Sequence, residues 1–498
     1  MEIRKLNLVE YVDAIKNKTF SAEKGVREFI AAIKADHRNA VLETFEATAI
    51  EQAQLIDKRL KSGEKLGRLA GAPILIKDNI LFKNHKATCA SKMLENFVAP
   101  YTSTVVEKML AEDAIIIGRA NMDQFAMGTT GETSAWGATL NAHSDQHVGG
   151  GSSSGSAVAV AANLCVAALG TDTGGSIRCP AAWNGLYSIK PTYGTVSRFG
   201  VVAFASSLDQ VGPICKTVDD ANLLLDVIRG KCENDATSIA YSVRRPSGDA
   251  CVRHIKSATA STPACTPERT SASTGHLRIG YVPQVWKHCD KIVGFDKFQQ
   301  LFETLKSHGH EIVNVDIKNI DLGLATYYVI APAEAASNLA RFDGVRYTSA
   351  PDAPNDLTDL YKKTRTNYFG DEVKRRINLG NYVLSSGYFD AYYGKAKAVQ
   401  AALKGEFKTA FEKCDVIIIP TTPDDAPKLK TGITDPLANY LIDLFTVVAN
   451  ITGIPALSMP FDRGSHGLPI GLQILGAPMH EETLVNASKI VATLGGVK

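Results

Sequence analysis

The sequence has 498 residues, and its 54 Lys and Arg residues against 52 Asp and Glu residues give a net charge of +2. Nucleic-acid-binding proteins usually carry a strong basic excess, and disordered chains contain few apolar residues, so a balanced composition that is 45% hydrophobic argues against both classes. The nine cysteines include no CxxC pair and the eleven histidines include no HExxH motif, which argues against a disulfide framework and a metal site.

The first part of the chain, residues 1–66, is expected to form an N-terminal helical segment. Leu8, Val12 and Ile15 recur at the spacing of one helix face. The first twenty residues contain no apolar signal segment. The longest apolar run, residues 157–169, is shorter than the roughly 20 residues that a helix needs to cross a bilayer. We therefore expect a cytoplasmic protein that makes no contact with a membrane.

Short apolar runs with the length of buried strands occur along the rest of the chain, at residues 72–76, 114–118, 277–281, 311–313, 416–420 and 471–474. They alternate with helical patterns, which predicts an α/β fold. Neither a repeat nor a clear linker divides the sequence, so we expect a single domain over residues 1–498. The Ser/Thr/Ala/Pro-rich stretch at residues 257–273 lacks periodicity and is expected to be a mobile surface insertion.

A Gly/Ser-rich segment, GGGSSSGS at residues 149–156, has three possible interpretations. A flexible linker does not usually lead directly into an apolar helical run, as this segment does. A phosphate-binding loop would carry a GxGxxG or GK[ST] pattern, and neither is present. A nucleophile elbow of the form GxSxG, centred on Ser153, needs a strand before it, whereas residues 142–147 are polar and typical of a turn.

A second serine-bearing turn, Asp172-Thr173-Gly174-Gly175-Ser176, is chemically more suitable. Its two glycines allow a tight turn in which several N–H groups beside Ser176 point at one place, as in an oxyanion hole. A serine nucleophile also requires a base. Lys77 follows an apolar strand, and burial at such a position would lower the pKa of its amine enough for it to accept a proton.

These segments resemble the signature of the amidase signature family, which matches residues 150–157 and 170–181 together with Ile76-Lys77-Asp78-Asn79. The separations agree as well, because Lys77 precedes Ser152 by 75 positions and Ser152 precedes Ser176 by 24. The resemblance extends over nearly the whole chain. It implies the amidase signature fold, in which helices cover both faces of a central mixed β-sheet.

The resemblance also implies a role for each residue of the site. Ser176 would be the nucleophile, Ser152 the bridging serine on a cis peptide bond, and Lys77 the base. The backbone N–H groups that would hold the oxyanion are those of Thr173, Gly174, Gly175 and Ser176.

Within this family, the chain is similar to the A subunits of the tRNA-dependent amidotransferases, on the evidence of residues 190–200, 205–213, 341–347 and 385–393. That similarity implies a glutaminase whose ammonia passes to a B subunit, which uses ATP and magnesium to amidate mischarged Glu-tRNA(Gln), and in some cases Asp-tRNA(Asn). A small C subunit would complete a heterotrimer. This chain itself would need no metal and no cofactor.

Glutamine carries an α-ammonium and an α-carboxylate, so its binding site needs both charges. The resemblance implies Asp443 for the ammonium, Arg376 for the carboxylate and Tyr327 as a supporting hydroxyl. The sequence pattern leaves open whether Arg375 or Arg376 faces inward, and it places Asp443 opposite the apolar stripe of its helix, on a solvated face. A stand-alone amidase acting on another carboxamide, or a scaffold without catalysis, are the alternative functions.

Overall fold

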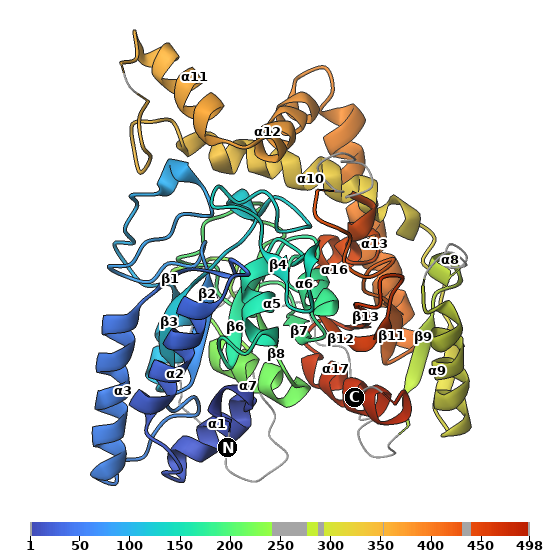
Figure 1. Cartoon of the computed structure of the whole chain (residues 1–498). Coiled ribbons are helices and arrows are strands. Elements are labelled where there is room, and N and C mark those ends of the chain that lie inside the picture. The colour runs from blue at the N-terminus through green and yellow to red at the C-terminus, as the bar shows by residue number, and fades with distance from the viewer. Residues whose placement is uncertain (1, 242–275, 287–292, 352, 431–439, 497–498) are drawn as a thin grey trace, which may run out of the picture.

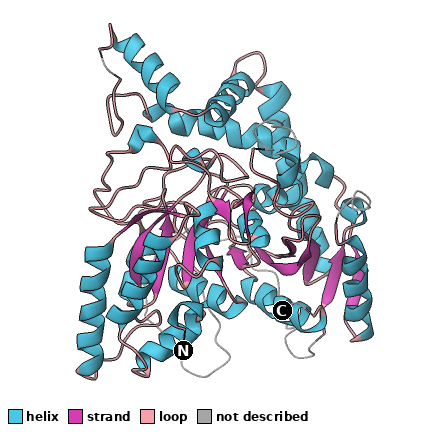
Figure 2. Ribbon diagram, in the orientation of Figure 1, coloured by secondary structure: helices cyan, strands magenta, loops and turns pink. Residues whose placement is uncertain are grey.

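One large β-sheet forms the centre of the molecule (Figures 1 and 2). The computed structural model describes residues 2–241, 276–286, 293–351, 353–430 and 440–496, and the insertion predicted at residues 257–273 lies outside them. Within the described residues the sheet has 11 strands, in the spatial order β1 (Val41–Thr44), β3 (Ile115–Ala120), β2 (Pro73–Lys77), β6 (Ala167–Asp172), β8 (Gln210–Cys215), β7 (Tyr187–Lys190), β12 (Ala456–Arg463), β13 (Pro469–Gly476), β11 (Val416–Pro420), β9 (Arg278–Tyr281) and β10 (Glu311–Asn314).

The sheet is mixed, as the family resemblance implies. β2 pairs in parallel with both β3 and β6, and β9 pairs in parallel with β10 and β11, whereas the central pairs from β6 to β12 are antiparallel. Each of the six strand predictions coincides with a strand of the structure. Continuous apolar runs are typical of strands that are buried on both faces, and β2, β3 and β11 are buried throughout.

Helices cover both faces of the sheet, which confirms the expected α/β class (Figures 1 and 2). α10 and α12 pack against each other and lie with α11 at the upper end of the view in Figure 1. The helices are α1 (Leu8–Lys16), α2 (Ala22–Ala35), α3 (Glu46–Lys61), α4 (Thr104–Ala111), α5 (Ser154–Ala161), α6 (Arg178–Trp183), α7 (Val218–Ile228), α8 (Pro283–Trp286), α9 (Phe295–Ser307), α10 (Gly323–Asn338), α11 (Leu357–Tyr368), α12 (Asp371–Leu384), α13 (Lys395–Lys413), α16 (Val447–Thr452) and α17 (Glu481–Leu494).

Two local expectations differ from the structure. The N-terminal segment contains three helices, α1 to α3, but it also contains the strand β1, which pairs with β3 at the edge of the sheet. The polar stretch expected to be a turn, residues 142–147, overlaps the strand β5 (Ser144–Val148), which forms a two-stranded hairpin with β4 (Leu140–Asn141). A strand therefore does precede the Gly/Ser segment, although its exposed polar residues hid it in the sequence pattern.

The chain brings the predicted catalytic segments to one edge of the sheet. β2 ends at Lys77, and its parallel neighbour β6 ends at Asp172, immediately before the Thr173–Ser176 turn. Because parallel neighbouring strands end at the same edge, Lys77 and this turn lie together. The Gly/Ser segment reaches the same place, since α5 begins at Ser154 and packs against both β2 and β6.

Candidate active site

Lys77 lies at the centre of a buried hydrogen-bond network. Its side chain is fully buried, and its Nζ lies 2.7 Å from Ser152 Oγ, 2.9 Å from Ser153 Oγ and 2.9 Å from Thr171 Oγ1. Burial lowers the pKa of Lys77 from 10.5 to about 7, although nearby carboxylates such as that of Asp123 act in the opposite direction. A large fraction of the amine is therefore neutral at pH 7 and able to accept a proton from Ser152.

The two predicted catalytic serines differ in their access to solvent. Ser152 is fully buried and follows a cis Gly151–Ser152 peptide bond, as the resemblance implies. Ser176 keeps 8% of its surface exposed, and its carbonyl accepts a hydrogen bond from the N–H of Ser153 at 3.1 Å. Within the described chain the Ser176 hydroxyl makes no hydrogen bond, so the link from Lys77 to Ser152 is formed and the link from Ser152 to Ser176 is not. Catalytic hydrogen bonds of this kind often close only when substrate binds.

The oxyanion-hole prediction needs one correction, at Gly175. Its N–H donates to Asp172 Oδ1 at 2.8 Å and is therefore occupied. The N–H groups of Thr173, Gly174 and Ser176 make no hydrogen bond to any residue that the structure describes. Three of the four predicted donors are thus available to a negatively charged oxygen, and the fourth holds the shape of the turn.

A buried ion pair stabilises the Thr173–Ser176 turn. Arg178 binds Asp172 with two hydrogen bonds of 3.0 Å, and neither side chain is exposed. Burial alone would raise the pKa of Asp172, but the guanidinium of Arg178 lowers it to about 2. Asn450 donates a further hydrogen bond to Asp172 at 2.9 Å. Asp172 is therefore ionised at neutral pH, and its carboxylate fixes the backbone of the turn by accepting the N–H of Gly175.

The three predicted substrate-binding residues are all buried near one another. Tyr327 lies on α10, Arg376 on α12 and Asp443 in the 3-10 turn Asp443–Phe445, with exposed fractions of 2%, 3% and 5%. The structure also decides between the two adjacent arginines. Arg376 turns inward, whereas the side chain of Arg375 is 45% exposed.

Asp443 is buried although the sequence pattern placed it on a solvated face. Burial raises the pKa of Asp443 to about 7, and Arg376 and the hydroxyl of Tyr328 counteract this rise. The residues that bury it come from α10 and α12, far away in the sequence. The pattern of its own helix could not reveal this cover.

Contacts join the substrate-binding segments to the serine-bearing turn. A side chain at Gly174 would place its Cβ 2.5 Å from Cζ of Tyr327, so the ring of Tyr327 lies directly against the turn. The hydroxyl of Thr446, three residues after Asp443, donates to the carbonyl of Gly174 at 2.6 Å. The charged pair Arg376 and Asp443 therefore belongs to the same site as Ser176.

Sequence reasoning missed several residues of this network. Most have a neutral polar side chain that acts through its buried position, which no local pattern reveals. Ser153, Thr171 and Arg178 lie within the quoted signature, but the resemblance gave none of them a role in the predicted site. The missed residues are Ser153, Thr171, Arg178, Tyr328, Thr446 and Asn450.

A comparison with family models finds that the model described as Amidase matches residues 24–485. The chain belongs to the amidase family. It is 45% identical over 491 residues to a glutamyl-tRNA(Gln) amidotransferase A subunit, the one numbered 2, of Clostridium acetobutylicum, covering 98% of this chain and 99% of the relative. It is 46% identical to the glutamyl-tRNA(Gln) amidotransferase A subunit of Thermosynechococcus vestitus, covering 88% of this chain and 87% of that relative.

Solved structures support the same relationship. The crystal structure of the glutamyl-tRNA(Gln) amidotransferase A subunit from Thermotoga maritima superposes with a TM-score of 0.74 at 35% identity, covering 98% of this chain and 94% of the other. A bacterial aryl acylamidase of the amidase signature family superposes with a TM-score of 0.81 at 22% identity, covering 99% and 97% of the two chains. At that identity the second likeness concerns the fold alone.

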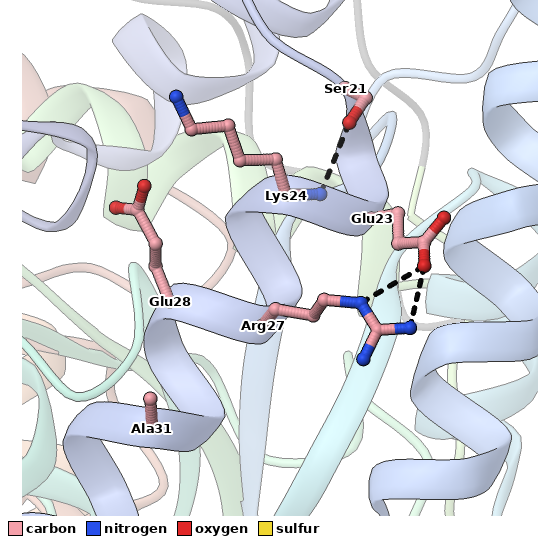
Figure 3. A pocket seen from close by; sticks show the side chains of 6 residues that line it. All are labelled: Ser21, Glu23, Lys24, Arg27, Glu28 and Ala31. Atoms are coloured by element: carbon pink, nitrogen blue, oxygen red, sulfur yellow. Dashed lines mark hydrogen bonds and ion pairs between the residues drawn. The ribbon is translucent and has the colours of Figure 1, made fainter.

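Other candidate sites are weak by comparison. The described parts of this amidase-family chain contain no cluster of three or more metal-ligating side chains, and none of their helices is long and apolar enough to cross a membrane. A surface depression of about 470 Å³ lies on α2, where Arg27 is paired with Glu23 (Figure 3). No predicted site residue lines this depression.

Proposed function

We propose that this chain is the glutaminase subunit of a tRNA-dependent amidotransferase and supplies ammonia for the conversion of Glu-tRNA(Gln) to Gln-tRNA(Gln). The conversion of Asp-tRNA(Asn) to Asn-tRNA(Asn) belongs to the same proposal. The observation that carries it is the pair of opposite buried charges, Arg376 and Asp443, beside the turn that holds Ser176. The α-carboxylate and α-ammonium of glutamine match this pair.

The hydrogen bond between Lys77 and Ser152 supports the first proton transfer of the proposed hydrolytic mechanism, and the remaining steps are those that the family resemblance implies. Neutral Lys77 takes a proton from Ser152 across 2.7 Å, and Ser152 takes one from Ser176, whose Oγ attacks the side-chain amide carbon of glutamine. The N–H groups of Thr173, Gly174 and Ser176 stabilise the tetrahedral oxyanion. Ser152 gives a proton to the leaving nitrogen and regains one from Lys77, so that ammonia departs and Lys77 is neutral again.

The second half of the reaction regenerates the enzyme. Water attacks the glutamyl ester on Ser176, and its proton passes through Ser152 to Lys77. Ser176 then recovers a proton as glutamate leaves. The sum is glutamine plus water giving glutamate plus ammonia, with no net change in the protein.

A stand-alone amidase acting on a simple carboxamide is the second candidate. It shares the fold and the Lys77-Ser152-Ser176 arrangement, but a simple carboxamide gives no reason to bury both Arg376 and Asp443 at the site. Arg376 is paired with Glu372 at 2.7 Å, whereas Asp443 Oδ1 accepts no hydrogen bond from the residues that the structure describes. Because a buried carboxylate is costly without a partner, Asp443 favours a substrate that brings a positively charged group to the site.

The relatives are named as subunits, which supports a role within an assembly. In the proposed heterotrimer, the B subunit receives the ammonia, uses ATP and magnesium, and binds the mischarged tRNA. The C subunit joins the two larger subunits. We place the reaction in the cytoplasm, and this chain contributes neither the nucleotide site nor a metal site.

The proposal is tested by co-expressing the chain with the B and C subunits and measuring amidation of Glu-tRNA(Gln) with either glutamine or ammonium chloride as nitrogen donor. Ser176→Ala should abolish the glutamine-dependent reaction and leave the ammonium-dependent reaction intact. Ser307→Ala, at the exposed end of α9, is the matched control and should change neither. Retained glutamine use by Ser176→Ala would refute the nucleophile. Hydrolysis of simple amides without any stable partner would favour the stand-alone amidase.

A further inference from the structure

A second tyrosine on α10, Tyr328, holds the carboxylate of Asp443. Its hydroxyl donates to Asp443 Oδ2 at 2.8 Å, and both side chains are buried, with exposed fractions of 9% and 5%. The other carboxylate oxygen, Oδ1, accepts no hydrogen bond from the residues that the structure describes. Tyr328 thus occupies one oxygen of Asp443 and leaves the other for a ligand.

The ring of Tyr328 is fixed from several sides. It stacks on Tyr440 with ring centroids 4.1 Å apart, and it meets Tyr327 edge to face at 5.0 Å. The guanidinium of Arg376 lies 5.4 Å from its centroid. These contacts hold the ring of Tyr328 in one orientation, and they therefore set the direction in which its hydroxyl points.

The charge on Asp443 depends on this contact. Burial raises the pKa of Asp443 to about 7, and the hydrogen bond from Tyr328 lowers it from a still higher value. Only the ionised carboxylate attracts an ammonium group. The other charged or titratable groups that act on Asp443 are Arg376 on α12, Arg178 and Cys179 on α6, Asp172 at the end of β6, and Tyr327 on α10.

We propose that Tyr328 is a positioning residue that sets selectivity for an α-ammonium group, because its hydroxyl holds one oxygen of Asp443 and leaves the other directed at the ligand. The chain therefore prefers a carboxamide with an α-amino group over the same carboxamide without one. This inference rests on the proposed function, in which glutamine is the substrate and Asp443 meets its ammonium.

The test compares two ligands that differ only in the amino group, L-glutamine and 4-carbamoylbutanoate. Their dissociation constants are measured by calorimetry on the full chain carrying Ser176→Ala, so that neither ligand is hydrolysed. Adding Tyr328→Phe should weaken glutamine binding about 10-fold to 100-fold, the usual range for a lost hydrogen bond to a charged group, and leave 4-carbamoylbutanoate binding unchanged. The matched control is Tyr11→Phe, which removes a buried hydroxyl that has no hydrogen-bond partner.

The pH dependence of binding supplies a second readout. Glutamine affinity should fall as the pH decreases through about 7, since Asp443 then becomes protonated, and Tyr328→Phe should move this midpoint to higher pH. In an Asp443→Asn background, Tyr328→Phe should have no further effect on the preference for glutamine.

The possible outcomes separate the two proposals. If Tyr328→Phe weakens both ligands equally, its role is structural and the inference is overturned. If the preference for glutamine and the midpoint stay unchanged, it is overturned as well, while the proposed function stands. If the Ser176→Ala chain binds no glutamine at all, the proposed function fails and this inference fails with it.

Discussion

Replacing Lys77 with methionine should abolish hydrolysis and yet stabilise the protein at neutral pH. The pKa of this amine is about 7 in the folded chain against 10.5 ordinarily, so the unfolded chain binds more protons between these values and the stability of the native chain rises with pH. The resulting penalty in the free energy of unfolding is about 4 kcal/mol at pH 7 and about 2 kcal/mol at pH 9.

Methionine removes this penalty but also removes the hydrogen bonds from Lys77 to Ser152, Ser153 and Thr171, worth about 1 kcal/mol each. The expected net change is a gain of about 1 kcal/mol at pH 7 and a loss of about 1 kcal/mol at pH 9. Denaturant unfolding midpoints at the two pH values measure this difference. Lys61→Met, at an exposed position on α3, serves as the control and should show no pH dependence. A change in stability that is equal at both pH values would refute the argument that burial keeps Lys77 neutral.

Three further outcomes are expected. At saturating glutamine, kcat for ammonia release should fall about 10-fold per pH unit below pH 7 and level off above pH 7, because only neutral Lys77 acts as a base. A kcat that stays constant down to pH 5 would exclude this role for Lys77. Gly174→Ala should lower kcat about 100-fold while the circular dichroism spectrum is retained, because the Cβ of the new alanine would lie 2.5 Å from the ring of Tyr327 and displace the oxyanion donors. Full activity of this variant would contradict the proposed oxyanion hole. Arg376→Gln should raise the KM for glutamine at least about 10-fold, whereas exposed Arg375→Gln should change it less than about 2-fold; equal effects of the two changes would argue against the inward assignment.

The sequence predicts those parts of the fold that depend on local composition. Strands such as β2, β3 and β11 are continuous apolar runs because they are buried on both faces, and such runs are visible without a structure. β5 escaped prediction because Asp145 and Gln146 are exposed and its strand conformation depends on pairing with β4. A local sequence pattern does not reveal with which other strand a strand will pair.

The same distinction holds within the site. The family resemblance predicts that Lys77, Ser152 and Ser176 lie together. The structure joins Lys77 to Ser152, and the carbonyl of Ser176 accepts a hydrogen bond from the N–H of Ser153. The pattern of its own helix places Asp443 on a solvated face, because α10 and α12, which cover it, are remote in the sequence. The resemblance predicts the N–H of Gly175 as a free donor, and only the three-dimensional structure reveals that Asp172 accepts it.

The strand order has a consequence for how members of this family diverge. In the spatial order of the sheet, the first six strands (β1, β3, β2, β6, β8 and β7) come from residues 41–215, and the other five (β12, β13, β11, β9 and β10) come from residues 278–476. Among the described strands, these two sets are hydrogen-bonded to each other only where β7 pairs with β12. Lys77, Ser152 and Ser176 belong to the first set's half of the chain, while Tyr327, Arg376 and Asp443 belong to the second. The proposed roles therefore place the groups that cleave the bond and the groups that select the substrate on separate stretches of the chain. Thr446 and Asn450 of the second stretch nevertheless support the serine-bearing turn of the first, so a chimera joined at this seam would also need those two contacts to form.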